Sequence, residues 1–175
     1  MEVFIASPFG NYIQPKGCVP VTGTWTLNPR GNRFWRVLKT LRYNSRMDGW
    51  QNNLGLPNPG IHKGLANILP GQILSIAEIQ EGEFLNLSRI IPFDQSIEIN
   101  ISCPNVDVPT PWRSLHYFME TDLRQYCIAK VSPLTSLDDL KFLIDEVGFK
   151  QLHFCNTLPL SNNSCLLYTS DAADE

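Results

Sequence analysis

Short apolar runs rich in β-branched residues recur along the chain, and polar turns separate them. This pattern is typical of strands buried in a sheet. Six runs predict strands, over residues 3–6, 19–26, 73–77, 97–101, 127–131 and 151–155. Between the later strands, apolar residues recur at helical spacing, which predicts helices over residues 59–69, 78–91, 113–125 and 136–147.

The last of these helices has the clearest boundaries. Ser136 followed by Asp139 forms a capping box with Asp in place of Glu, and Gly148 occupies the position of a helix C′ residue. One apolar face is expected, made of Leu137, Leu140, Ile144 and Val147.

Strand and helix alternate from about residue 73 onward at the spacing of βαβ units, which indicates an α/β fold. A doubly wound nucleotide-binding fold would carry a Gly-rich phosphate turn after its first strand, and none is present. Polar residues instead lie at the end of nearly every strand, which is typical of a (β/α)8 TIM barrel with its site on the C-terminal face. These residues are Gly10, Asn11, Gly23, Thr24, Cys103, Lys130, Asn156 and Thr157. Because a closed barrel needs eight strands, we expect a barrel truncated after about six.

Residues 28–58 show little periodicity, and a loop of this length is usually functional or wrongly assigned. We expect an active-site loop that covers the barrel mouth. A surface insertion is disfavoured because Trp35, Trp50 and several Leu would need burial.

Composition narrows the class of protein. The 175 residues are 43% hydrophobic and 18% charged with a formal net charge of −3, and no basic patch indicates a nucleic-acid partner. No apolar run approaches the length of a membrane span, and the N-terminus lacks the features of a signal peptide. The cysteines are odd in number and lack paired metal-ligand spacing, so we expect reduced thiols, no metal site and a cytoplasmic location.

Residues 165–175 read Cys-Leu-Leu-Tyr-Thr-Ser-Asp-Ala-Ala-Asp-Glu. This string resembles the in-frame translation of a sequencing-library transposase adapter. We therefore expect two parts, a partial barrel over residues 1–164 and a non-native tail over residues 165–175. A disordered polar tail is the alternative.

The segment Asn100-Ile101-Ser102-Cys103-Pro104-Asn105 carries the most chemistry. Pro104 ends the strand, so Cys103 should lie just past a strand end, together with a hydroxyl and two carboxamides. A Cys alone is often a small buried hydrophobe, but that does not explain its polar neighbours. Cys103 could act as a nucleophile, a redox thiol or a general base. No motif places a histidine beside it, and structural or surface roles are expected for His62, His116 and His153.

Four asparagines stand in turn contexts that could face one site: Asn52, Asn100, Asn105 and Asn156. Each alone is typical of a turn, but together they could bracket a planar uncharged ring with alternating N–H and C=O groups, such as a pyrimidine. Lys130 lies inside an apolar strand and needs an anionic partner if it is buried. Near the strand end it could meet a cofactor phosphate, a substrate anion or an electron-rich ring.

The ordered set of motifs resembles the dihydroorotate dehydrogenase family. The motifs are residues 22–26 with Arg30-Gly31-Asn32, residues 52–60, the segment 100–105 quoted above, Ala129-Lys130-Val131-Ser132-Pro133, and Asn156-Thr157. They occur in the family's order over nearly all of residues 1–160. The resemblance implies an FMN-binding (β/α)8 barrel that oxidises dihydroorotate to orotate in pyrimidine biosynthesis.

The resemblance also implies a role for each site residue. Cys103 would be the base that removes the proton at C5 of the substrate, as in the soluble class, while hydride passes from C6 to the flavin N5. Lys130 would stabilise the reduced flavin at its N1/O2 edge. The pyrimidine would be held by Asn52, Asn100, Asn105 and Asn156. The flavin would be contacted by Gly10, Gly23, Thr24, Asn100 and Lys130. The full-length protein is expected to bind a small dihydropyrimidine, with no nucleic-acid or membrane partner, and to form a homodimer.

Two departures from the family pattern leave alternatives open. Gly23 stands where the soluble class usually has a Lys that contacts the orotate carboxylate, and Arg30, Arg42 or Lys16 could replace it. The Gly-Gly segments that bind the FMN phosphate belong to the family's last two strands, so we expect these 175 residues to bind FMN poorly and to be inactive. The alternatives are a related FMN oxidoreductase acting on another dihydropyrimidine, and a non-catalytic pyrimidine-binding barrel.

Overall fold

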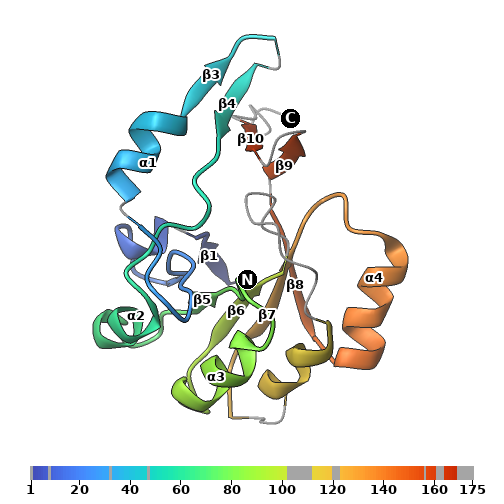
Figure 1. Ribbon diagram of the computed structural model, residues 1–175. Coiled ribbons are helices and arrows are strands. Elements are labelled where there is room, and N and C mark those ends of the chain that lie inside the picture. Colours follow the sequence, from blue (N-terminus) through green and yellow to red (C-terminus); the bar gives the residue numbers. More distant parts are fainter. Residues whose placement is uncertain are drawn as a thin grey trace.

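The computed structural model describes residues 2–7, 9–31, 33–46, 48–101, 112–119, 123–155, 157–160 and 164–168. Its centre is a parallel sheet of four strands that follow one another in chain order (Figure 1). These strands are β5 (Leu74–Ile76), β6 (Ile97–Asn100), β7 (Cys127–Val131) and β8 (Gln151–Phe154).

The two preceding strands extend the same parallel order. Strand β1 (Val3–Ile5) pairs in parallel with β2 (Cys18–Pro20), and η1 (Phe9–Asn11) lies between them in the chain. Single parallel bridges, Val21 to Ile73 and Trp25 to Ile76, then connect the stretch after β2 to β5. Five of the six predicted strands are confirmed, and the second, predicted over residues 19–26, is a strand only over Cys18–Pro20 with single bridges beyond it. This mixed α/β arrangement with its parallel sheet is compatible with a partial TIM barrel.

Alternate residues of the central strands face a core made with the helices. Ile97 and Ile99 of β6 and Ala129 of β7 are fully buried, and they pack with Phe84 and Leu143 from two covering helices. The covering helices are α2 (Ile61–Asn67), α3 (Glu83–Ile90), η2 (Trp112–Phe118) and α4 (Leu137–Lys141), which continues as η3 (Phe142–Val147). The strand residues between these positions point to the opposite face, which we call the inner face.

The caps of α4 are as the sequence predicts. Ser136 Oγ accepts a hydrogen bond from Asp139 N at 3.1 Å, and Gly148 ends η3 with a φ of 92°. The expected apolar face was wrong in part, because Leu137 is 75% exposed and Ile144 is 47% exposed. Leu143 lies in the core in place of Ile144, and it joins Leu140 and Val147 there at a spacing of three and four residues. The segment Phe142–Val147, which carries these residues, is π-helical.

The third predicted helix is shorter than expected. The sequence predicted a helix over residues 113–125, but within this range the structure has the 3₁₀ segment η2, and Arg124 belongs to no helix or strand. The Arg124 guanidinium donates to the carbonyl oxygens of Phe118, Pro92 and Gln95 at 2.9–3.3 Å. These bonds hold residue 124 in the connection to β7, outside any helix.

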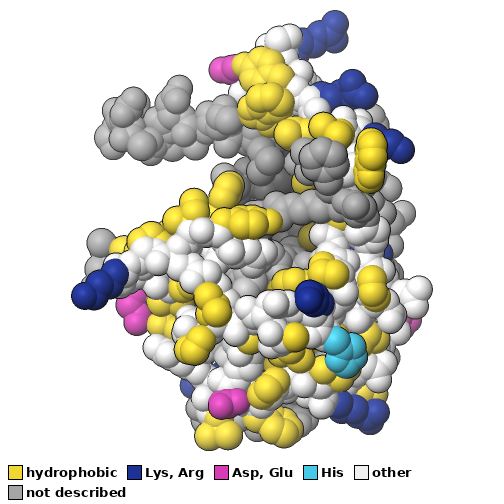
Figure 2. Space-filling view, turned by 90° about the vertical axis from the view of Figure 1, so that its left-hand side faces the viewer, with side chains coloured by type: hydrophobic (Ala, Val, Ile, Leu, Met, Phe, Trp, Pro, Cys, Tyr) yellow, Lys and Arg dark blue, Asp and Glu magenta, His cyan; other side chains and the backbone are white. Residues whose placement is uncertain are grey.

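The prediction of an irregular loop over residues 28–58 was wrong. This stretch contains α1 (Arg33–Thr40), β3 (Arg42–Asn44) and β4 (Gly49–Asn52), which project beyond the carboxyl ends of the parallel strands (Figure 1). The expected burial of the two tryptophans is also wrong, since Trp35 is 60% exposed and Trp50 is 41% exposed. Figure 2 shows hydrophobic side chains on the surface of the projecting part.

Strand β4 belongs to a second, antiparallel sheet. Its order is β3-β4-β10-β9, where β9 spans Thr157–Leu160 and β10 spans Ser164–Tyr168. The sequence predicted no element in the tail, whose first residues form β10. Across the described residues no helix is both long and apolar enough to cross a bilayer. Cys18 and Cys127 carry free thiols.

Candidate active site

Polar side chains gather on the inner face of the parallel sheet, toward the carboxyl ends of its strands. Strand pairing places Ser75 of β5 beside Glu98 of β6. Two residues closer to the carboxyl ends, it places Asn100, Lys130 and His153 side by side on β6, β7 and β8. Below them the inner face is apolar, lined by Val21, Ile73 and Ile128 with Val19 and Tyr126. The sheet therefore presents a polar layer at the end where parallel α/β sheets bind ligands.

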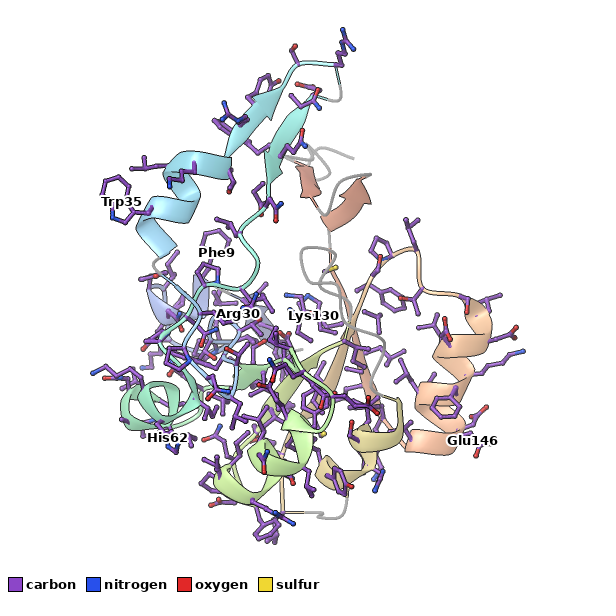
Figure 3. All side chains as sticks on the ribbon, viewed as in Figure 1. Phe9, Arg30, Trp35, His62, Lys130 and Glu146 are labelled. Carbon is purple, nitrogen blue, oxygen red and sulfur yellow. The ribbon has the colours of Figure 1, made fainter. Side chains whose placement is uncertain are left out.

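Glu98 is the centre of this polar layer. We call the four residues Ser75, Glu98, Lys130 and His153 the Glu98 cluster. The Glu98 carboxylate is fully buried. Oε1 accepts the Ser75 hydroxyl proton at 2.8 Å, and it lies 3.9 Å from Lys130 Nζ. Oε2 lies 2.7 Å from His153 Nδ1. Figure 3 shows Lys130 at the centre of the molecule, whereas Trp35, His62 and Glu146 lie at its periphery.

Burial disfavours the charged form of Glu98, and this is the largest single influence on its pKa. The hydrogen bond from His153, the charge of Lys130 and the Ser75 hydroxyl outweigh it, so the pKa of Glu98 lies below its usual range. Glu98 is therefore an anion at neutral pH. An ionised carboxylate only accepts hydrogen bonds, so His153 donates through Nδ1–H.

A directed hydrogen-bond chain connects Asn100 to Glu98. Asn100 Nδ2 donates to Thr24 Oγ1 at 3.2 Å, and Thr24 Oγ1 lies 3.0 Å from Ser75 Oγ. Because Ser75 gives its only hydroxyl proton to Glu98, the proton between the two hydroxyls comes from Thr24. The order of donation is Asn100 to Thr24 to Ser75 to Glu98. This chain fixes the orientation of the Asn100 carboxamide.

A local bulge aims Thr24 into this network. The bridges Val21 to Ile73 and Trp25 to Ile76 enclose three residues on one side and two on the other, so one extra residue is accommodated. Gly23 N donates to Asn11 Oδ1 at 3.1 Å, which holds the bulge against η1. The N–H of Gly23, a predicted flavin contact, thus has a protein acceptor.

Gly10 has a packing reason to be glycine. A Cβ at this position would lie 2.2 Å from the carbonyl oxygen of Val21, where no side chain fits. Its carbonyl oxygen accepts a hydrogen bond from Gln72 Nε2 at 3.0 Å. Gly10 is therefore explained by the contact between η1 and the stretch after β2, and its predicted contact with a flavin stays a prediction.

Asn52 lies on β4, in the antiparallel sheet, whereas the Glu98 cluster lies on the parallel one. The residue is 4% exposed, and its Oδ1 accepts a hydrogen bond from Leu54 N at 3.3 Å. The turn that follows is left-handed at two consecutive positions, Gly55 with a φ of 63° and Leu56 with a φ of 56°. A left-handed Leu is strained, so the surrounding contacts must hold it.

Asn58 and Arg30 hold this turn. The Asn58 carboxamide donates to the Leu56 carbonyl oxygen at 2.9 Å and accepts from Gly60 N at 2.9 Å. It also bonds the backbone and the hydroxyl of Thr26. Arg30 Nε donates to the Gly55 carbonyl oxygen at 3.1 Å. These contacts connect the turn after Asn52 to the stretch that carries Thr24.

The structure brings together Thr24, Asn100 and Lys130 of the predicted site. Cys103, Asn105 and Asn156 lie outside the described residues. The expectation that Lys130 has an anionic partner is confirmed by Glu98. Within the part of the chain that is described, no group of three His, Cys, Asp or Glu residues is arranged to hold a metal ion.

Sequence reasoning missed Glu98 and His153. Glu98 stands inside the apolar run 97–101, and a charge inside a buried strand requires a partner, the same rule that was applied to Lys130. The same rule, applied to Glu98, would have identified Glu98 as the anionic partner of Lys130. His153 was interpreted as structural or at the surface, and its side chain is in fact only 30% exposed and bound to Glu98.

Comparison with known proteins points to one family. The chain is 30% identical over 158 residues to the catalytic subunit of dihydroorotate dehydrogenase B (NAD(+)) from Endomicrobium trichonymphae, covering 79% of the chain and 49% of that protein. It is 36% identical over 110 residues to the corresponding subunit from Thermoanaerobacter pseudethanolicus, covering 56% of the chain and 34% of that protein. The chain is related to the dihydroorotate dehydrogenase family.

A fumarate-type relative gives a shorter match. Dihydroorotate dehydrogenase A (fumarate) from Lactiplantibacillus plantarum is 41% identical over 71 residues, covering 34% of the chain and 23% of that protein. No family model matches the chain. The chain spans about half the length of the dihydroorotate dehydrogenases that it matches over most of its residues.

Proposed function

We propose that the chain is part of a flavin-dependent oxidoreductase that converts dihydroorotate to orotate in pyrimidine biosynthesis. The observation that carries the proposal is the position of Lys130 and Asn100 beside one another at the carboxyl ends of parallel strands, with Glu98 beneath them. Relatives named dihydroorotate dehydrogenase support the choice of substrate.

The donor chemistry of the site fits FMN. Lys130 supplies a positive charge whose side chain is 13% exposed, and its Nζ is too far from Glu98 Oε1, at 3.9 Å, for a hydrogen bond. Asn100 supplies an oriented carboxamide next to it. We propose that Lys130, Asn100 and Thr24 hold the ring of the flavin, with backbone contacts from Gly10 and Gly23. When bound, FMN would supply the hydride acceptor.

The remaining roles concern the substrate. We propose that Cys103 is the general base at C5, and that Asn52, Asn100, Asn105 and Asn156 hold the pyrimidine ring through their carboxamides. Lys130 would stabilise negative charge that develops in the ring bound beside it. Fixing Asn100 through Thr24, Ser75 and Glu98 prepares one of these carboxamides before the substrate arrives.

The boundaries of the functional unit belong to the same proposal. We propose that residues 1–164 are part of the barrel, that residues 165–175 are a non-native tail, and that the full-length protein is a homodimer. Because the chain spans about half the length of its relatives, these 175 residues alone are proposed to bind FMN poorly and to be inactive. A soluble yellow protein from these residues would overturn that part.

A second candidate substrate follows from Gly23. The soluble class usually has a Lys there that contacts the orotate carboxylate, and glycine offers no charge. A dihydropyrimidine without a carboxylate is therefore the alternative.

The test uses the full-length protein recovered from its gene and loaded with FMN. Dihydroorotate and dihydrouracil are offered separately without oxygen, and flavin bleaching is followed. Reduction by dihydroorotate supports the proposal, and reduction by dihydrouracil alone would favour the alternative. Cys103→Ala should retain FMN and lose turnover near neutral pH. Turnover at the wild-type rate would show that Cys103 is not the base.

A further inference from the structure

Glu98 lies between two groups that can carry positive charge. Lys130 approaches Oε1 from β7, and His153 donates to Oε2 from β8. Ser75 completes the set from β5, with its hydroxyl on Oε1. The carboxylate is fully buried, whereas the His153 side chain is 30% exposed and can exchange protons with solvent.

The protonation of His153 decides the net charge of the Glu98 cluster. With neutral His153, the charges of Lys130 and Glu98 cancel, and the cluster has no net charge. With a second proton on the ring, the imidazolium compensates Glu98, and the positive charge of Lys130 is left unbalanced. The Nδ1–H to Oε2 bond is compatible with both states, so the geometry can persist while the charge changes.

We propose that His153 is a positioning residue that sets, through Glu98, how much of the positive charge of Lys130 is available to an anionic ring bound beside it. The role of that ring rests on the proposed function, but the coupling between His153 and Lys130 does not. The charge of Lys130 stays the same when His153 gains a proton. The negative charge of Glu98 is then compensated by His153, so it no longer offsets the charge of Lys130.

Another charged group reaches the inner face at its apolar end, where Glu2 Oε1 accepts a hydrogen bond from the Tyr126 hydroxyl at 2.9 Å. Gln151 precedes His153 on that face, and the thiol of Cys155 follows it. Cys127 of β7 lies on the outer face, where burial raises the pKa of its thiol to about 11. The helix residues that cover β8 contact its outer face, since Leu152 joins their core. Their charged members are Asp138, Asp139, Lys141, Asp145 and Glu146, with Lys150 in the turn before β8.

The coupling can be measured on the 175-residue chain without a cofactor. The imidazole nitrogens are followed by NMR over a pH series in wild type, Lys130→Met and Glu98→Gln. His62 and His116 are exposed, so they serve as references in the same spectra. Removing Lys130 leaves His153 as the only cation on Glu98, so the titration of His153 should move to higher pH. A change of about tenfold in proton affinity is expected.

Glu98→Gln should move the His153 titration in the opposite direction, and neither variant should move His62 or His116. If Glu98→Gln does not fold, Lys130→Met still decides the question. A His153 titration that is unchanged in Lys130→Met would overturn the inference, whatever the protein oxidises.

A second readout connects the coupling to the site. In the full-length protein loaded with FMN, the flavin reduction potential is measured against pH in wild type and His153→Gln. Gln retains a neutral donor for Glu98 and cannot gain a proton. The role of His153 is supported if the reduction potential of wild type changes with pH where His153 titrates and this change is absent in His153→Gln. Identical profiles in both proteins would overturn it. Failure of dihydroorotate to reduce the flavin would instead reject the proposed function and leave the coupling standing.

Discussion

Glu98 on β6 and His153 on β8 form a 2.7 Å hydrogen bond across the inner face of the parallel sheet. The carboxylate is fully buried, and the imidazole is partly open to solvent. Strand β7 lies between their two strands and contributes Lys130 to the same carboxylate. A buried carboxylate with this many donors is an organised site, and it determines the orientation of groups at the carboxyl ends of the strands.

Glu98 should make the fold sensitive to acid. Because its folded-state pKa lies below the unfolded value of about 4.5, its contribution is complete above that pH and is lost as the pH falls through the folded pKa. Glu98→Gln should lower the free energy of unfolding at pH 7 by about 3 kcal/mol.

Urea unfolding of both proteins from pH 7 down to pH 3 measures this effect, with the exposed Glu81→Gln as the control. The difference between wild type and Glu98→Gln should shrink toward pH 3. A loss that stayed equal at every pH would mean that the carboxylate charge is not what stabilises the fold.

Asn58→Ala should loosen the turn that follows Asn52. The substitution removes hydrogen bonds to Leu56, Gly60 and Thr26, and a loss of about 2–4 kcal/mol in unfolding free energy is expected. Amide hydrogen exchange at Gly60 and Thr26 should accelerate. Asn67→Ala, which removes one exposed contact to Lys63, is the control. Equal effects of the two variants would contradict the role given to Asn58.

Gly10→Ala should destabilise the fold through a direct clash. The new Cβ would meet the Val21 backbone at 2.2 Å, whereas Gly71→Ala places its Cβ in open space and suffers only from a φ of 81°. Gly71→Ala is expected to cost about 1–2 kcal/mol, and Gly10→Ala more than that. Thermal unfolding of both variants checks the order. The opposite order would show that η1 can move away from Val21.

Ser136→Ala should shorten or loosen the helix at α4. Its hydroxyl caps Asp139 N and bonds the Asp139 carboxylate, so a loss of about 1 kcal/mol is expected. Thr135→Ala removes a hydroxyl one position earlier and is the matched control. Equal unfolding free energies for the two variants would leave the capping box without an energetic role.

The sequence predicted the parallel strands well because their β-branched runs follow from local side-chain preference. It failed at α1, β3 and β4, where exposed aromatic residues on a projecting part look like residues that need burial. It also failed at Ile144, because Leu143 and Ile144 are adjacent apolar residues and either one fits helical spacing from Leu140.

Only those residues of the site that carry a local signal in the sequence could be predicted. Lys130 stands out as a charge in an apolar strand, and Asn100 belongs to a motif. His153 has no motif, and its role depends on the register between β6, β7 and β8, which brings residues 98, 130 and 153 together from separate strands. Such a register is a property of the assembled sheet and cannot be derived from one strand at a time.

The most direct test of the proposed function is anaerobic mixing of dihydroorotate with the FMN-loaded full-length protein, followed at the visible absorbance of the flavin. We predict bleaching by dihydroorotate in wild type, and slower bleaching in Lys130→Met, since that variant lacks the charge beside Asn100. A flavin that dithionite reduces and dihydroorotate leaves unchanged would contradict the assignment.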